Sequence, residues 1–153
     1  MPPPYEVLGC PRVFFGPEDY TETADCQAYM THILNVTDEE NSTHKNSREV
    51  CEVKWIYADD SPDFRIMERV WPPALEWILS VLKENDRNCV YIHCHMGINR
   101  SATIAVALSA YFTRKPIWEI INIIRRRDKR LIMTNDGFIG QLMGWEYKKL
   151  FNQ

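Results

Sequence analysis

A cysteine and an arginine with five residues between them form the pattern in this chain that most clearly points to chemistry. Residues 93–101 read His-Cys-His-Met-Gly-Ile-Asn-Arg-Ser, which puts the cysteine at position 94 and the arginine at position 100. A loop of this length can curl so that successive backbone N–H groups point inward, and such a ring binds phosphate. Arg100 offers a planar fork for two phosphate oxygens, where lysine would give a point charge. Cys94, at the base of the ring, is predicted to be a nucleophile that attacks phosphorus.

The same loop is expected to activate the Cys94 thiol. The thiolate is the nucleophilic form, and N–H donors, a helix N-terminus and a nearby arginine all favour it. We expect Ser101 to donate to the sulfur and help it leave, and His93 to support the loop and the thiolate through its ring nitrogens. Gly97 lies mid-loop, where the backbone needs an angle closed to residues with a Cβ. The alternative is an inert core cysteine, and the glycine, arginine and serine around Cys94 argue against it.

The flanking segments predict how this loop is held. Cys89 to His93 is a short run of β-branched and aromatic residues, which is typical of a strand. Ser101 to Phe112 is apolar and rich in alanine, which is typical of a helix. The loop therefore joins a strand to a helix, and the helix N-terminus adds its partial positive charge to the phosphate site.

The pattern His93-Cys94-x5-Arg100-Ser101 resembles the signature of the cysteine-based protein tyrosine phosphatases, and the whole chain is similar to their short dual-specificity branch. The resemblance implies an α/β fold, a central mixed sheet flanked by helices, with the site at the carboxyl end of the Cys89–His93 strand. Because Arg100 and the N–H ring supply the positive field, we expect neither a metal nor a cofactor. The phosphate-binding residues that the resemblance implies are His95, Met96, Gly97, Ile98, Asn99 and Arg100.

The general acid is predicted from the same resemblance. Val50 to Ile56 alternates as a strand with one exposed face does, and it leads into the acidic, turn-rich segment from Ala58 to Asp63. A mobile carboxylic acid there can protonate the leaving oxygen and later act as base on water. In the dual-specificity family the acid lies in such a loop, and matching the strands puts it at Asp60. Asp59 is the alternative.

A second residue carried over from the family is Asn135, whose counterpart hydrogen-bonds the phosphate loop. Here Thr134 stands where the family usually has proline. Thr134-Asn135-Asp136 is also a typical N-cap for a last helix. The basic run from Arg125 to Arg130 precedes it, and it is interpreted either as complementing a helix C-terminus or as a docking patch for acidic phosphoproteins or nucleic-acid phosphates.

The remaining segments supply the frame. Val13 to Gly16 and His32 to Val36 are predicted core strands, whereas Thr37 to Glu49 is polar and without periodicity and is predicted to be a solvated loop without a function. Pro62 to Glu84 is predicted to supply a helix with Pro72-Pro73 at its start or at a kink. Its expected core stripe is Leu75, Ile78, Leu79 and Leu82. After Pro116 another helix is predicted, with a buried face formed by Ile117, Ile120, Ile121 and Ile124.

Composition limits the class of protein. The 153 residues are 45% hydrophobic and 25% charged, with a net charge of −3, which suits a single globular domain over residues 1–153 and gives no global argument for nucleic-acid binding. We expect no signal peptide and no membrane span. The odd number of cysteines, 5, favours reduced thiols over a disulfide framework. The protein is therefore expected to be intracellular, in the cytoplasm, the nucleus or both.

Three functions compete. The leading hypothesis is a phosphoprotein phosphatase acting on phosphotyrosine and on phosphoserine or phosphothreonine. The second is an RNA 5′-phosphatase or triphosphatase, because Gly97-Ile98-Asn99-Arg100 resembles the loop of the cysteine-based RNA triphosphatases, although Ser101 and Asp60 favour protein substrates. The absence of lysine between Cys94 and Arg100 argues against phosphoinositides. The third is a phosphate-binding scaffold without turnover, which the intact set of reactive residues disfavours.

Overall fold

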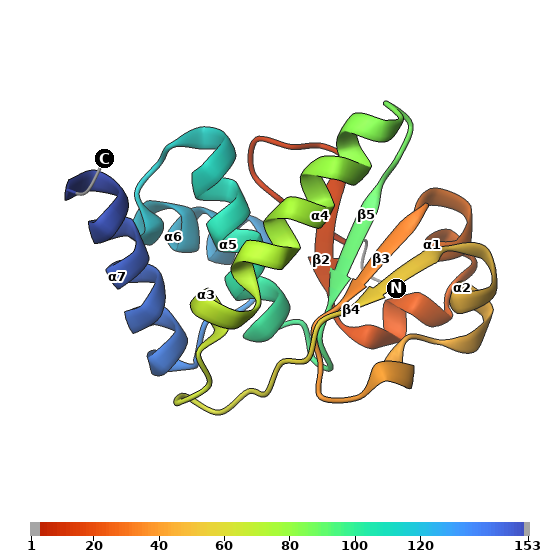
Figure 1. Ribbon diagram of the computed structural model, residues 1–153, viewed down its shortest axis with the longest axis horizontal. Helices are drawn as coiled ribbons and strands as arrows, with labels where there is room; N and C mark the ends of the chain where they lie inside the picture. The colour runs from red at the N-terminus through yellow and green to blue at the C-terminus, as the bar shows by residue number, and fades with distance from the viewer. Residues whose placement is uncertain (1–3, 152–153) are drawn as a thin grey trace.

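A mixed sheet organises the protein, as expected for the α/β class. The computed structural model describes residues 4–151, and its five strands lie in the order β1-β2-β5-β3-β4 (Figure 1). Strand β1 is antiparallel to β2, and the other neighbours are parallel. The strands are β1 Tyr5–Glu6, β2 Val13–Gly16, β3 His32–Asn35, β4 Glu52–Trp55 and β5 Val90–His93.

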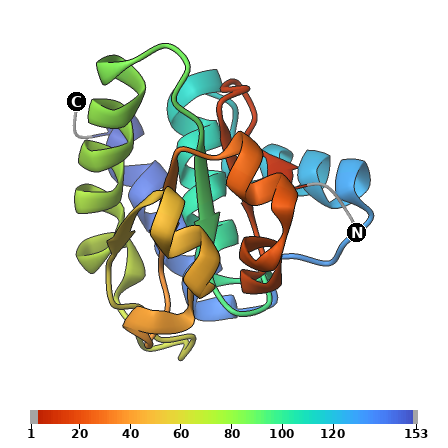
Figure 2. The same ribbon diagram turned by 90° about the vertical axis from the view of Figure 1, so that its right-hand side faces the viewer.

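Helices cover both faces of this sheet (Figure 2). The smaller layer packs around Tyr20 and Tyr91, and the larger layer forms the main core with the other face. The smaller layer consists of η1 Glu18–Glu22, α1 Ala24–Tyr29 and α2 Lys45–Val50. The larger layer consists of α3 Ile66–Arg69, α4 Trp71–Glu84, α5 Arg100–Thr113, α6 Ile117–Asp128 and α7 Asp136–Phe151.

Strand β5 lies at the centre of the fold. It pairs with β2 on one side and β3 on the other, and all of its residues are buried. Val90 and Ile92 point into the larger core and Tyr91 into the smaller one, because successive side chains of a strand face opposite sides. Helix α5 follows directly and is buried along most of its length. The loop that carries Cys94 is therefore held between two of the most buried elements.

The segment from Thr37 to Glu49 is mostly exposed, as predicted, but it is not an irregular loop. The segment contains a short 3-10 helix, η2 Glu40–Ser42, and most of α2. Thr37, Thr43 and Ser47 are fully buried, because each hydroxyl has a hydrogen-bond partner inside the fold. The polar composition correctly indicated exposure for most of this segment, but not for these three residues.

The region predicted as one helix from Pro62 to Glu84 is divided. Helix α3 ends at Arg69, and α4 begins at Trp71 with prolines in its first turn, as the Pro72-Pro73 pair predicted. Of the predicted stripe only Ile78 is fully buried, and the other members are half-buried. Tryptophan and alanine instead contribute to the contact between α4 and the core. The buried residues of the helix are Trp71, Ala74, Ile78 and Val81.

The helices after α5 agree with the sequence. In α6 the four predicted isoleucines are all buried, and Pro116 is the N-cap. The side-chain oxygen of Asn135 accepts the N–H of Phe138 at 3.1 Å, which caps α7 as predicted. Among residues 4–151, no helix combines the length and the apolar character that crossing a bilayer requires.

Candidate active site

The loop between β5 and α5 lies at the edge of the sheet where the parallel strands end, beside the loops that follow β3 and β4 (Figure 1). Cys94 is only 2% exposed at the base of this loop. Its sulfur accepts the backbone N–H of Gly97 at 3.2 Å and lies 3.2 Å from the hydroxyl oxygen of Ser101. Both groups can donate to a sulfur anion, so the immediate surroundings of Cys94 suit a thiolate.

Gly97 shapes the loop as the sequence predicted. Its φ of +71° lies in the left-handed region. A Cβ at this position would lie 2.5 Å from the backbone nitrogen of Pro17, so the loop also passes too close to the end of β2 for any side chain. This close approach holds the Gly97 N–H against the sulfur of Cys94.

Arg100 forms one wall of the site. It is 6% exposed, and its Nη1 donates to the carbonyl oxygen of Ala58 at 3.0 Å and to a carboxylate oxygen of Asp38 at 3.4 Å. Its Nε is buried and has no hydrogen-bond partner in the described part of the chain. A buried guanidinium donor without an acceptor is costly, and a phosphate oxygen would supply that acceptor.

His95 is held between two carboxylates. Its Nδ1 lies 2.9 Å from a carboxylate oxygen of Glu18, and its Nε2 lies 3.0 Å from one of Asp38. Partial burial acts to lower the pKa of His95, but the hydrogen bonds to Glu18 and Asp38 outweigh it and raise that pKa. The hydrogen bond from His95, helped by Arg100, lowers the pKa of Asp38. Asp38 was not predicted as a site residue, because it lies in the segment predicted to have no function.

His93 contacts the loop backbone and not the sulfur. Its Nδ1 lies 3.0 Å from the carbonyl oxygen of Cys94, and its Nε2 lies 2.7 Å from the hydroxyl of Thr43. Burial lowers the pKa of His93 to about 4, so the ring is neutral at pH 7. His93 therefore supports the loop as expected, but among its contacts in the described structure none reaches the Cys94 sulfur.

Asp60 reaches the phosphate loop through asparagines. The side-chain nitrogen of Asn99 lies 3.4 Å from one of its carboxylate oxygens, and the side-chain nitrogen of Asn135 lies 3.2 Å from the other. Asn135 also donates to the backbone carbonyl of Asp60 at 2.8 Å. Asp59 is exposed and makes no comparable contact among the described residues. Of the two candidates for the acid, Asp60 is the one that faces the loop.

The predicted hydrogen bond between Asn135 and the phosphate loop is present, but the backbone of Asn135 makes it. Its side chain binds the Asp60 segment, and only its backbone N–H reaches the loop, donating to the Asn99 side-chain oxygen at 2.9 Å. The same oxygen accepts the N–H of Thr134 at 2.8 Å. Asn99 thus connects the phosphate loop to the Asp60 segment and to the start of α7 by hydrogen bonds. The sequence analysis did not predict this role of Asn99.

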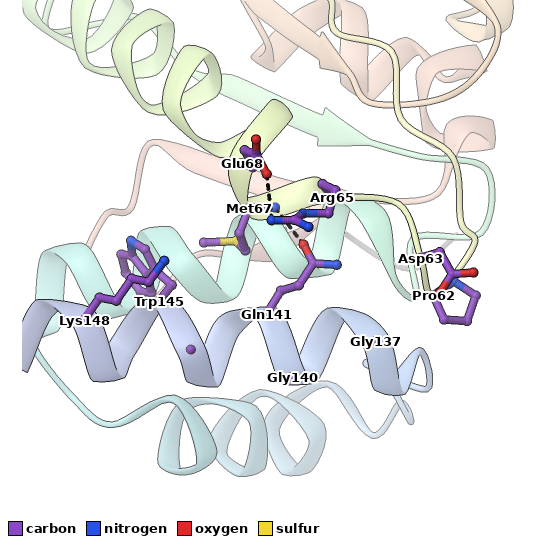
Figure 3. Close-up of a pocket in the computed structure, with 11 residues that line it drawn as sticks. Pro62, Asp63, Arg65, Met67, Glu68, Gly137, Gly140, Gln141, Trp145 and Lys148 are labelled. Atoms are coloured by element: carbon purple, nitrogen blue, oxygen red, sulfur yellow. Dashed lines mark hydrogen bonds and ion pairs between the residues drawn. The ribbon is translucent and has the colours of Figure 1, made fainter.

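The acid loop, residues 57–65 between β4 and α3, rests on the start of α7. Figure 3 shows Pro62 beside Gly137, next to a groove of about 850 Å³ that does not include the phosphate loop. A Cβ on Gly137 would lie 2.7 Å from Pro62 Cα, so only glycine admits this contact. Farther along α7, Gln141 donates to the carbonyl oxygen of Phe64 at 2.7 Å. Helix α7 therefore sets the position of the acid loop.

The other residues predicted to bind phosphate have no individual side-chain role in this geometry. Met96 is 68% exposed, and the carbonyl of Ile98 accepts the N–H of Met133 at 2.9 Å. Two arginines of the basic run from Arg125 to Arg130 donate hydrogen bonds to backbone carbonyls of the fold. Arg125 donates to the carbonyl of Ile132, and Arg130 donates to that of Gly97 at 2.7 Å. These contacts favour the structural interpretation of the run over a docking patch.

One group in the described part of the chain has ligand atoms close enough for a metal, formed by Asp38, Glu39 and His95 within 4.8 Å of one another. Both ring nitrogens of His95 already face carboxylate oxygens, at 2.9 and 3.0 Å. That arrangement favours the protonated ring, which has no lone pair for a metal. The residues present therefore fit an ion-paired imidazolium better than a metal centre.

Comparison with known proteins agrees with this geometry. The family model described as "Dual specificity phosphatase, catalytic domain" matches residues 14–148, so the chain belongs to that family. Rat dual specificity protein phosphatase 5 is 29% identical over 94% of this chain, and mouse dual specificity protein phosphatase 13B is 31% identical over 76% of it. The chain spans 35% of the first relative and 59% of the second.

Solved structures share the fold. The human tyrosine phosphatase-like serine/threonine/tyrosine-interacting protein superposes with a TM-score of 0.81 at 24% identity, covering 95% of this chain and 96% of that one. DUSP15 gives a TM-score of 0.81 at 18% identity, covering 97% and 90%. The mixed sheet flanked by helices is therefore confirmed as the fold of this family.

Proposed function

We propose that the chain is a phosphoprotein phosphatase that hydrolyses phosphotyrosine and phosphoserine or phosphothreonine through a phosphocysteine intermediate. One observation carries the proposal. The Cys94 sulfur accepts the Gly97 N–H at 3.2 Å and lies 3.2 Å from the Ser101 hydroxyl oxygen, and the buried Nε of Arg100 has no hydrogen-bond partner within residues 4–151. A nucleophile therefore lies in the same loop as an unpaired hydrogen-bond donor that can bind an oxyanion. Attack on a phosphate needs both groups.

In the first step the Cys94 thiolate attacks phosphorus, and the bond from phosphorus to the substrate oxygen breaks. Arg100 and the backbone N–H groups of residues 95–100 hold the three equatorial oxygens. Asp60, protonated at the start, gives its proton to the leaving oxygen. The products of this step are the free hydroxyl of the substrate and a phosphocysteine.

In the second step water attacks the phosphocysteine. The Asp60 carboxylate takes a proton from that water, and the sulfur leaves as a thiolate that Ser101 stabilises. Inorganic phosphate departs, and Asp60 is again protonated for the next cycle. Asn99 and Asn135 hold Asp60 beside the loop and His93 holds the loop backbone, so these are positioning residues.

The wider setting belongs to the same proposal. We infer one catalytic domain over residues 1–153, with phosphorylated proteins as substrates. The five cysteines are free thiols, which supports an intracellular, reducing location such as cytoplasm or nucleus. No specific contact favours the RNA alternative, and the intact Cys94, Arg100 and Asp60 argue against a scaffold without turnover.

The experiment is parallel measurement of phosphate release from a phosphotyrosine peptide, a phosphothreonine peptide and a 5′-triphosphorylated RNA. We expect turnover of both peptides and little of the RNA. The Cys94→Ser variant should hydrolyse none of them, yet still bind the peptides. RNA turnover above that of both peptides would overturn the choice of substrate, and undiminished turnover in the variant would overturn the choice of nucleophile.

A further inference from the structure

Carboxylates dominate the mouth of the phosphate site. The segments that follow β2, β3 and β4, residues 17–22, 36–44 and 57–63, contain nine aspartates and glutamates and no lysine or arginine. Two of these carboxylates, those of Glu18 and Asp38, pair with the ring nitrogens of His95. Arg100 and His95 lie within the loop, and Arg130 donates to the carbonyl oxygen of Gly97. On the side formed by the three segments, a ligand approaching Cys94 meets a negative field.

Two exposed aromatic rings lie in the same region. Trp55 is 36% exposed and Tyr57 is 52% exposed, and their ring centres are 6.5 Å apart in an edge-on arrangement. The indole N–H of Trp55 donates to the carbonyl oxygen of Thr37 at 3.0 Å, which brings the ring beside the turn that carries Asp38 and Glu39.

The rings are also close to the phosphate site. Ala58, the residue after Tyr57, donates its N–H to Thr37 and accepts the Nη1 of Arg100 at 3.0 Å. The aromatic pair is therefore separated from the wall of the phosphate pocket by one residue. A peptide whose phosphate binds at Arg100 can place a neighbouring side chain on these rings.

Two of the carboxylates around the rings are available to a ligand. Glu39 and Asp59 are exposed, and within residues 4–151 neither side chain has a hydrogen-bond or ion-pair partner. The Glu39 carboxylate lies within 4.8 Å of the His95 and Asp38 groups, at the rim of the loop. We call Glu39, Trp55, Tyr57 and Asp59 the mouth surface. Aromatic faces next to free carboxylates bind guanidinium and ammonium groups.

We propose that the mouth surface selects phosphoprotein segments that carry an arginine or lysine next to the phosphorylated residue. The proposal rests on the proposed function, because the unpartnered Nε of Arg100 is what anchors the phosphate. The phosphate then binds in the pocket while the basic side chain binds outside it. A polyanion such as an RNA 5′ end would instead place further phosphates against carboxylates.

The test compares phosphotyrosine peptides that differ only in the flanking residue, which is arginine, alanine or glutamate. We expect kcat/KM to fall in that order, by about tenfold from arginine to glutamate at low ionic strength, and the difference to shrink as salt is added. Glu39→Gln and Tyr57→Ser should each reduce the ratio of the arginine to the glutamate peptide. Glu84→Gln removes the same charge at the end of α4, near the opposite edge of the sheet, and should leave the ratio unchanged.

Binding to the Cys94→Ser variant separates this inference from the proposed function. Tighter binding of the arginine peptide without any turnover by the unmodified protein would support the mouth surface and refute the phosphatase. Equal affinity for the three peptides would refute the mouth surface, even if all three are hydrolysed. Tighter binding of a 5′-triphosphorylated RNA than of the arginine peptide would refute it as well.

Discussion

Replacing Gly137 with alanine should displace the acid loop and slow the release of poor leaving groups. The added Cβ would lie 2.7 Å from Pro62 Cα and closer still to its carbonyl oxygen, whereas ordinary contacts begin at 3.4 Å. The loop must therefore retreat by about 1 Å, and a misplacement of that size can cost roughly 100-fold in rate. Such a shift also disrupts the 2.8 Å hydrogen bond from Asn135 to the Asp60 carbonyl.

The assay compares kcat/KM, which reports the first step, for a phosphothreonine peptide and for an aryl phosphate whose phenol is acidic. The peptide needs a proton from Asp60 and the aryl ester barely does, so we expect a loss of about 10- to 100-fold for the first and about threefold or less for the second. Gly140→Ala is the matched control, because nothing lies within 4 Å of a Cβ there. Thermal unfolding of both variants checks that α7 remains folded.

A double variant decides whether Gly137 acts through the acid. If it does, adding Gly137→Ala to Asp60→Ala should cause almost no further loss, because the proton donor is already absent. Losses that multiply in the double variant would refute the reasoning. Equal slowing of the peptide and the aryl ester by Gly137→Ala alone would refute it too.

Three further predictions concern titratable groups. His93 has a folded pKa of about 4, below its ordinary 6.5, so its contribution to stability is complete above pH 6.5 and is lost as pH falls toward 4. The urea midpoint should therefore drop more steeply across that range in the unmodified protein than in His93→Asn, and parallel curves would contradict this. Asp38→Asn should lower the pKa of His95 measured by NMR, because one of its two carboxylate partners is lost; an unchanged pKa would show that Glu18 alone sets it. Asp60→Ala should lower kcat/KM, which reports the first step, strongly for the phosphothreonine peptide and weakly for the acidic aryl ester, and an equal fall for both would turn attention to Asp59.

The elements around the phosphate loop could be predicted because their sequences carry strong local signals. The strand ending at His93 is a run of β-branched and aromatic residues, and Gly97 has the positive φ that its place in the loop predicted. In α6 the isoleucines fall on one face at helical spacing, and all four are buried. In these segments the hydrophobic pattern coincides with burial, so the local sequence is sufficient to predict the element and its buried face.

The surroundings of the site were harder to predict because they depend on hydrogen bonds between distant segments. Thr43 can be buried because its hydroxyl has a hydrogen-bond partner 2.7 Å away, the Nε2 of His93. The composition of residues 37–49 does not indicate this partner. Asp38 likewise meets His95 and Arg100 only once β3 and β5 are paired. Asn135 does hydrogen-bond the phosphate loop as expected, through its backbone N–H, whereas the contact of its side chain with Asp60 was not predicted.

The most direct test of the account is to look for a phosphoryl group on the Cys94 sulfur during turnover. In Asp60→Ala the second step lacks its base, so rapid acid quenching with an aryl phosphate substrate should trap the intermediate, and mass spectrometry of the proteolysed protein should find one phosphoryl group on Cys94. A phosphoryl group on another residue, or turnover with Cys94 never modified, would contradict the central claim that this sulfur is the nucleophile.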